Sequence, residues 1–165
     1  MQDKSIKIFI PLGTQKFPFN RLIKEINRLI EKKAIKRENI FIQSAIFDII
    51  PLCDYTTILS NSSFQKKIEE ADLIITHCGV NSIISCMRLN KKLIIVPRLK
   101  QYGEHVDNHQ TEIANLMKNK FKICCLDNVS KLLETVPIAI NTQYKPWNGN
   151  PDQLITTIRN IIINL

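Results

Sequence analysis

The stretch ADLIITHCGVNS, Ala71 to Ser82, decides the fold that the sequence predicts. Its apolar run LIITH, Leu73 to His77, has the length and composition of a buried strand. A segment of helical period begins shortly afterwards, at Asn81, and runs to Leu89. A buried strand that leads straight into a helix is typical of a parallel sheet covered by helices.

The same alternation continues along the chain. Strands are expected at residues 7–12, 39–43, 55–59, 73–77, 92–97 and 121–126. Helices are expected at residues 19–30, 62–70, 81–89, 107–120 and 154–162, with Ser62 capping the second, and residues 141–151 as a turn-rich connection. We therefore predict an α/β fold, a Rossmann-like parallel sheet with helices on both faces, as a single domain over residues 1–165.

Length and composition favour a protein of a reducing compartment. The five cysteines are odd in number and lack the paired spacing of a metal site, so we expect Cys53, Cys86, Cys124 and Cys125 to serve as small buried apolar groups. The first residues do not have the pattern of a signal peptide, and no apolar run reaches membrane-spanning length. We expect a cytoplasmic protein.

The positive charge is concentrated at the beginning of the chain. The net charge is +8, and the first forty residues carry ten Lys or Arg against four Asp or Glu. This basic face around the first helix is either ordinary solvated surface or a contact for anionic lipid head groups or an acidic partner. Aromatic residues are few and not interleaved with the basic ones, so we do not expect binding to nucleic acid.

A parallel sheet brings the loops that follow its strands to one edge, where open α/β folds bind ligands. Gly13-Thr14, Ser44, residues 77–82 and residues 97–110 should therefore converge. Three of the four glycines and all three histidines lie in these loops. The sequence predicts a binding site at this edge.

The turn at residues 77–82 has the features of an anion site. Gly79 permits a tight turn, and Asn81 and Ser82 stand where a helix begins and can offer donors to a diphosphate. His77 could donate a hydrogen bond to a phosphate oxygen or to the charge on a leaving group. The structural alternative is a helix capped by Ser82 beside a satisfied buried histidine.

The segment VPRLKQYGEHVDNHQTEIA, Val96 to Ala114, carries more polar side chains than a structural loop requires. His105 and His109 stand at i, i+4 and could form a zinc site with His77 or Cys78, although the supporting carboxylate pattern is missing. A Cys78 nucleophile paired with a histidine is a second alternative. The Cys78 alternative leaves the Asn81-Ser82 helix start and the cluster Asn108, His109 and Gln110 without a role.

Three groups of residues together resemble the C-terminal, nucleotide-sugar-binding domain of glycosyltransferase family 28. They are GT…F…RL after the first strand, ADLIITHCGVNS, and KKLIIVPR…YGEHVDNHQ…A. The likeness covers nearly the whole chain. It is closest to the small subunits of two-component glycosyltransferases, of the dolichol-linked N-acetylglucosaminyltransferase type and of the bacterial exopolysaccharide type.

The resemblance implies roles for particular residues. It implies catalytic roles for His77, which would offset the charge of the leaving diphosphate, and for Glu104 or His105 as general base, unless a partner supplies the base. Many relatives hold the ribose with a glutamate at the position of Ser85, so this contact would come from elsewhere, such as Glu104. The implied donor-binding residues are Gly13, Thr14, His77, Gly79, Asn81, Ser82, Arg98, Asn108, His109 and Gln110.

The resemblance also implies a reaction and a partner. The chain would be the donor-binding half of a GT-B enzyme that transfers a hexose or N-acetylhexosamine, with inversion and without a metal or other cofactor, from a UDP-sugar to a lipid-linked acceptor in exopolysaccharide or capsule synthesis. The acceptor half would be a separate membrane-anchored subunit, which would place this chain at the inner face of the plasma membrane. The alternative is a non-catalytic accessory subunit that stimulates such a partner.

Overall fold

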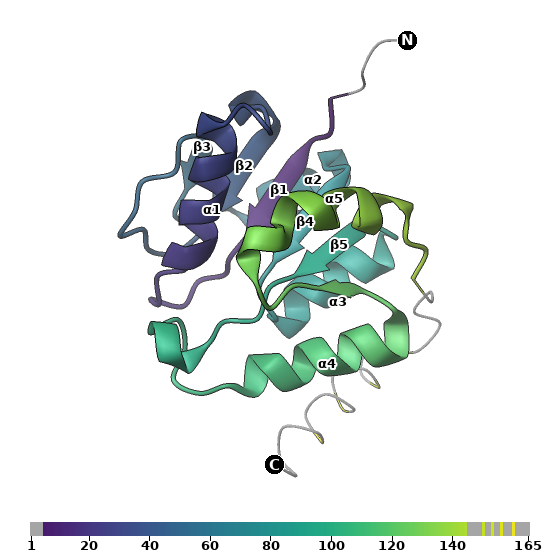
Figure 1. The fold of residues 1–165 in the computed structure, drawn as a ribbon. Coiled ribbons are helices and arrows are strands. Elements are labelled where there is room, and N and C mark those ends of the chain that lie inside the picture. The colour runs from purple at the N-terminus through teal and green to yellow at the C-terminus, as the bar shows by residue number, and fades with distance from the viewer. Residues whose placement is uncertain (1–4, 145–149, 151–152, 154–155, 157–159, 161–165) are drawn as a thin grey trace.

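The computed structural model describes residues 5–144 together with residues 150, 153, 156 and 160 (Figure 1). Within them the chain forms one six-stranded sheet of order β3-β2-β1-β4-β5-β6, in which every neighbouring pair is parallel. The strands are β1 (Ile8–Pro11), β2 (Ile40–Gln43), β3 (Asp54–Thr56), β4 (Leu73–Thr76), β5 (Lys92–Ile95) and β6 (Cys124–Cys125). This confirms the predicted fold class.

Helices connect the strands on both sides of the sheet. They are α1 (Asn20–Glu31), α2 (Asn61–Glu70), α3 (Val80–Arg88), α4 (His109–Phe121) and α5 (Leu132–Asn141), with short 3-10 turns at Arg37–Asn39, Lys100–Tyr102 and Val129–Lys131. Most of the expected helix at residues 154–162 and most of the expected connection at 141–151 lie outside the described residues. Described residues contain no helix both long enough and apolar enough to cross a membrane.

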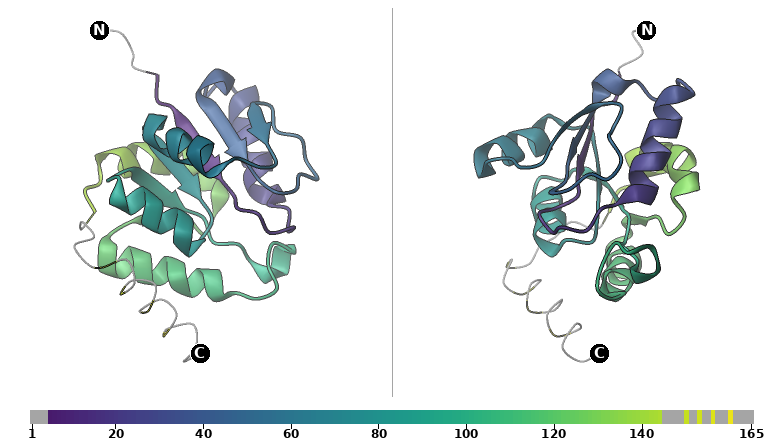
Figure 2. Two further views of the ribbon diagram at one scale, coloured as in Figure 1. Left: turned by 180° about the vertical axis from the view of Figure 1, so that it is seen from behind. Right: turned by 90° about the vertical axis from the view of Figure 1, so that its left-hand side faces the viewer.

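Side chains that alternate along the central strands build two separate cores. On β1, Ile8 and Ile10 face the core beneath α1 and α5, whereas Phe9 between them faces the core beneath α2, α3 and α4. Figure 2 shows α1 and α5 on one side of the sheet and α2 and α3 on the other. Because both faces are covered, the central strands are mostly apolar, as is typical of buried parallel strands.

The helices differ from the sequence-based prediction at two places. The N-cap of α2 is Ser60, whose side chain accepts a hydrogen bond from the Ser63 N–H, and not Ser62. Helix α5 was not expected, because Pro137 lies inside it and lacks the N–H that a helix interior needs. Leu132 and Ala139 of α5 are buried against the sheet, so tertiary burial holds this helix in spite of its proline.

The strand order creates a crevice between the two central strands. The chain leaves β1 for α1 on one face of the sheet and leaves β4 for α3 on the other face. The two loops therefore diverge where β1 and β4 lie side by side, which is the position where open α/β sheets bind ligands.

Candidate functional site

A cleft of about 540 Å³ opens at this crevice. It is lined by the loops after β1 and β4, by the start of α3, and by residues that precede and begin α2, namely Ile58, Leu59, Asn61 and Phe64. Of the residues expected to contact a donor, the cleft is lined by Gly13, Thr14, His77, Gly79, Asn81 and Ser82. The predicted convergence of the loops after β1 and β4 is thus confirmed.

The His77 imidazole lies between two glycines. A Cβ atom added at Gly13 would stand 2.7 Å from Nε2, and one added at Gly79 would stand 2.6 Å from the same atom. Gly13 also has a φ of +82°, a conformation that other residues adopt only with strain. Glycine is therefore required on both sides of His77, and it leaves Nε2 beside the cleft.

The other ring nitrogen of His77 faces Gln110 of α4. Gln110 is buried, and its Oε1 accepts hydrogen bonds from the Cys78 N–H at 3.2 Å and from the Arg98 N–H at 3.0 Å. Its Nε2 lies 3.4 Å from His77 Nδ1. Gln110 thus joins the loop after β4 to the loop after β5 and contacts His77, rather than extending into the cleft.

Burial, together with the smaller effects of the charges of Arg98 and His105, lowers the pKa of His77 to about 3. The imidazole is therefore neutral at pH 7. It can meet an anion as an N–H donor, and it brings no positive charge of its own.

Helix α3 begins shortly after this histidine and has no side-chain cap. Its N-cap is Gly79, and the helix starts at Val80, so the alternative in which Ser82 caps the helix is wrong. Asn81 is exposed and Ser82 half-exposed on the first turn. The positive end of the helix dipole and the first-turn N–H groups therefore lie at the cleft, as an anion site requires.

Arg98 belongs to the interior and not to the cleft. Its side chain is fully buried, and its terminal nitrogens donate to the carbonyls of Phe17 at 2.7 Å, Glu104 at 3.2 Å and Leu12 at 2.8 Å. The guanidinium also stacks 4.7 Å from the centre of the Phe19 ring. Instead of contacting a donor, Arg98 holds the loop after β5 against the loop after β1.

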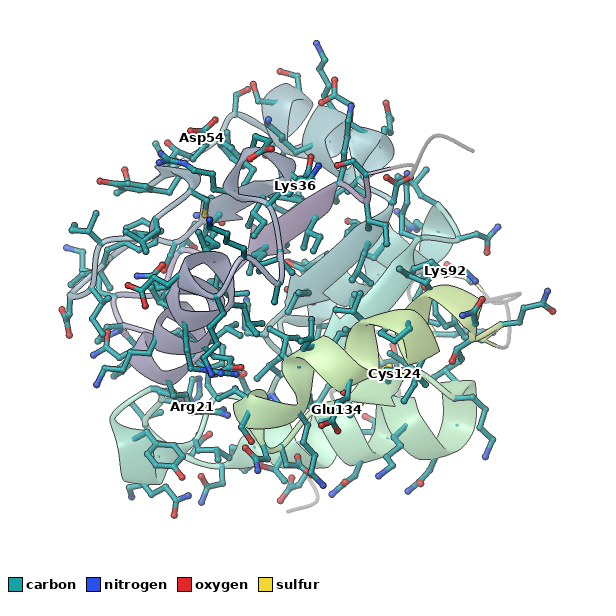
Figure 3. The ribbon with its side chains drawn as sticks, turned by 45° about the horizontal axis from the view of Figure 1, so that its top comes forward. Arg21, Lys36, Asp54, Lys92, Cys124 and Glu134 are labelled. Atoms are coloured by element: carbon teal, nitrogen blue, oxygen red, sulfur yellow. The ribbon has the colours of Figure 1, made fainter. Side chains whose placement is uncertain are left out.

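Glu104 is likewise committed to an internal interaction. Its carboxylate is 1% exposed, receives the Arg21 Nε–H at 2.9 and 3.0 Å, and accepts the Leu99 N–H at 3.0 Å. Arg21 stands at the end of α1 above this segment (Figure 3) and also donates to the Pro97 carbonyl. Glu104 therefore contacts neither the cleft nor solvent, and this geometry gives no support to its expected roles as general base and ribose contact.

The remaining polar residues of the segment surround Asp107. His105 Nδ1 lies 2.9 Å from Asp107 Oδ1, and His109 Nε2 lies 3.7 Å from Asp107 Oδ2. Asp107 Oδ1 also accepts the His109 N–H at 3.1 Å, whereas Asn108 Oδ1 accepts the Lys100 N–H at 3.0 Å. These residues fold the loop onto itself, and none of the three expected site residues among them lines the cleft.

The thiol and metal alternatives have less support in the geometry. Cys78 is 2% exposed, and burial raises the pKa of its thiol well above the usual value, which is the opposite of an activated nucleophile. In the described part of the chain no three His, Cys, Asp or Glu side chains are grouped to hold a metal ion.

Two parts of the cleft were missed in the sequence. Gln43, the last residue of β2, is buried and donates from Nε2 to the carbonyls of Gly13 at 3.1 Å and Thr57 at 3.0 Å. A glutamine at the end of an apolar strand was the available signal. The second part, Ile58, Leu59 and Phe64, forms an apolar wall that no local motif marks.

Comparison with known proteins identifies the family. The model of the glycosyltransferase family 28 C-terminal domain matches residues 7–141. The chain is 41% identical over 95 residues to the UDP-N-acetylglucosamine transferase subunit ALG13 of Candida albicans, which is 58% of this chain and 31% of that protein. It is 38% identical over 81 residues to the subunit of the same name from Candida glabrata, 49% of this chain and 34% of that protein.

The matched regions span about a third of the length of these curated relatives. The solution NMR structure of ALG13 superimposes with a TM-score of 0.59 at 16% identity, covering 93% of this chain and 95% of that one, which shows a shared fold. Three observations point to the same family: the crevice at the β1–β4 switch point, the HCGVNS turn, and the match over residues 7–141. The chain belongs to glycosyltransferase family 28, and its residues 7–141 correspond to the C-terminal domain of that family.

Proposed function

We propose that this chain is the UDP-sugar-binding subunit of a two-component inverting glycosyltransferase. The observation that carries the proposal is the placement of His77 Nε2 between Gly13 and Gly79 at the uncapped start of α3. A neutral N–H donor and a helix N-terminus at one end of a cleft suit the diphosphate of a nucleotide sugar. The Candida relatives are UDP-N-acetylglucosamine transferase subunits, which makes UDP-N-acetylglucosamine the first donor to test.

The proposed reaction needs charge stabilisation on the leaving diphosphate. As the sugar departs, negative charge grows on the phosphate oxygens, and the His77 N–H and the first turn of α3 would stabilise it without reorganising. The proposal assigns this task to the protein and includes no metal. The apolar residues Ile58, Leu59 and Phe64, which also line the cleft, offer a surface for a flat nucleobase.

The acceptor side of the reaction is assigned to a partner. We propose a membrane-anchored subunit that binds a lipid-linked acceptor and holds this chain at the inner face of the plasma membrane. Transfer of a hexose or N-acetylhexosamine in exopolysaccharide or capsule synthesis remains part of this proposal. The general base comes either from that partner or from His105, whose Nδ1 is engaged by Asp107 and whose side chain is 15% exposed.

Calorimetry with UDP, UDP-N-acetylglucosamine, UDP-glucose and UDP-galactose tests the donor site. The wild type and an Asn115→Ala variant on the exposed side of α4 should bind equally. A His77→Ala, Asn81→Ala double variant that keeps its circular dichroism spectrum should lose binding by at least tenfold, because two donors to an anion are removed. Absence of binding by the wild type, repeated with the membrane partner present, would refute the donor site and favour the accessory role.

A further inference from the structure

The buried amide of Gln110 contacts the loop after β4, the loop after β5 and the side chain of His77. Its Oε1 accepts the main-chain N–H groups of Cys78 and Arg98, and a main-chain N–H can only donate. These two bonds fix which end of the amide is oxygen. The NH₂ end must therefore face His77, where Nε2 lies 3.4 Å from Nδ1.

This orientation determines the proton position on the imidazole. An amide NH₂ has no acceptor capacity, so His77 Nδ1 must be the unprotonated, accepting nitrogen. A neutral imidazole then carries its proton on Nε2. That atom lies beside Gly13 and Gly79, where the ring borders the cleft.

We propose that Gln110 is a positioning residue that holds His77 in the Nε2–H tautomer, so that the histidine always presents a hydrogen-bond donor to the cleft. The consequence for donor binding rests on the function proposed above, whereas the tautomer itself does not. The same amide ties the loop after β4 to the loop after β5, so its bonds fix the ring position together with its protonation. Gln110 thereby acts through His77 rather than on the substrate.

Gln110→Glu is a sharp test because it keeps the shape and replaces the NH₂ donor by an acceptor. The carboxylate can still accept the N–H groups of Cys78 and Arg98, but it can only accept from His77 Nδ1. At pH 8 the proton should therefore move to Nδ1 and leave Nε2 bare. Gln101→Glu, an exposed residue of the same segment, introduces the same charge without touching His77 and serves as control.

The first readout is the long-range ¹⁵N spectrum of the His77 ring in the free protein. Wild type and Gln101→Glu should show Nε2 protonated and Nδ1 unprotonated at pH 8, and Gln110→Glu should show Nδ1 protonated. A protonated Nδ1 in the wild type, or an unprotonated Nδ1 in folded Gln110→Glu, would overturn the proposal. This measurement requires neither a donor nor a partner.

The second readout is UDP affinity from pH 8 to pH 6. The charged groups acting on His77, besides the introduced carboxylate, are Arg98 and His105. In Gln110→Glu the affinity should fall at least tenfold at pH 8 and recover towards the control at pH 6, where the carboxylate favours an imidazolium with both nitrogens protonated. A loss equal at both pH values would overturn the positioning role in favour of structural damage. If the wild type binds no UDP, the proposed function fails while the ¹⁵N spectrum still decides the tautomer.

Discussion

The imidazole of His77 occupies the space that any side chain at Gly13 would need. Nε2 stands 2.7 Å from the position of a Cβ on Gly13, and Gly79 presses on the ring from the other loop at 2.6 Å. These two glycines are far apart in sequence and belong to the loops after β1 and β4. Their contact with one histidine is what turns the crevice between the central strands into a defined site.

Gly13→Ala should therefore cost both stability and donor binding. The control is Gly103→Ala, because Gly103 has a similar φ of +68° but nothing within 4 Å of its added Cβ. Strain alone should lower the free energy of unfolding by about 1 kcal/mol at Gly103, and the clash with His77 should make the loss at Gly13 larger by a further ~1–2 kcal/mol. Chemical denaturation and UDP calorimetry measure the two effects. Equal losses in the two variants would contradict the contact with His77.

Removal of Arg21 should destabilise the fold strongly. Its bond to the buried Glu104 carboxylate joins α1 to the loop after β5, and its loss leaves that carboxylate unpaired, at a cost of about 3 kcal/mol in the free energy of unfolding. Lys66→Ala breaks an exposed pair with Glu70 and should cost under about 0.5 kcal/mol.

A double-variant cycle checks the cause of that loss. Adding Glu104→Gln to Arg21→Ala removes the unpaired charge and should restore part of the stability. If the second substitution makes the protein still less stable by its full single-variant cost, the two residues act independently and the ion pair is not the reason.

The free energy of unfolding should fall with acidification below pH 6.5. The pKa of His77 is lowered from 6.5 to about 3 in the folded protein, mainly by burial. Between these values the unfolded chain binds a proton that the folded protein does not. The contribution of His77 to the free energy of unfolding is therefore complete above pH 6.5 and is lost as the pH falls towards 3. One such group contributes at most about 1.4 kcal/mol per pH unit.

Urea titrations of wild type and His77→Asn from pH 7 to pH 4 measure the pH-dependent contribution of His77 to stability. The difference in stability between the two proteins should change with pH in favour of the variant as the pH falls. Parallel pH profiles would show that His77 is protonated in the folded protein and would contradict its burial.

The thiols should be slow to alkylate in the native protein. Burial raises the pKa of Cys53 to about 11 and those of Cys86 and Cys125 to about 12. Iodoacetamide at pH 7.5 should modify half-buried Cys124 first and leave UDP binding unchanged, while all five thiols should react in denaturant. Rapid modification of Cys78 with loss of UDP binding would instead support the thiol alternative.

Local patterns predicted most of the elements and half of the site. The apolar runs and helical periods located the strands and helices from β1 to β6 within a few residues, because buried parallel strands and amphipathic helices have distinct periods. Gly13, His77 and Asn81 could be assigned to the cleft because loops after parallel strands share one edge. Helix α5 was missed because Pro137 opposes a helix locally and only packing against the sheet favours it.

The roles of the polar residues in the loop after β5 could not be predicted from the local sequence. Arg98, Glu104 and Gln110 have the chemistry of ligand-binding side chains. The family resemblance implied donor contacts for Arg98 and Gln110, and the role of general base or ribose contact for Glu104. Each is buried, and each makes its hydrogen bonds to main-chain groups or to another side chain of the protein. Which polar groups remain available depends on partners distant in the chain, such as Arg21 and Leu12.

The sequence by itself determined the parallel α/β sheet, the edge at which its loops meet, and the glycine and histidine turn at that edge, since each follows from short-range periodicity and from the geometry of parallel strands. The tertiary structure alone decided that His77 places its Nε2 atom at the cleft, and that Arg98 and Glu104 hold the loop after β5 in place. The physical reason is desolvation: a buried polar group must find partners, and only the folded chain shows which of its groups those partners have already engaged.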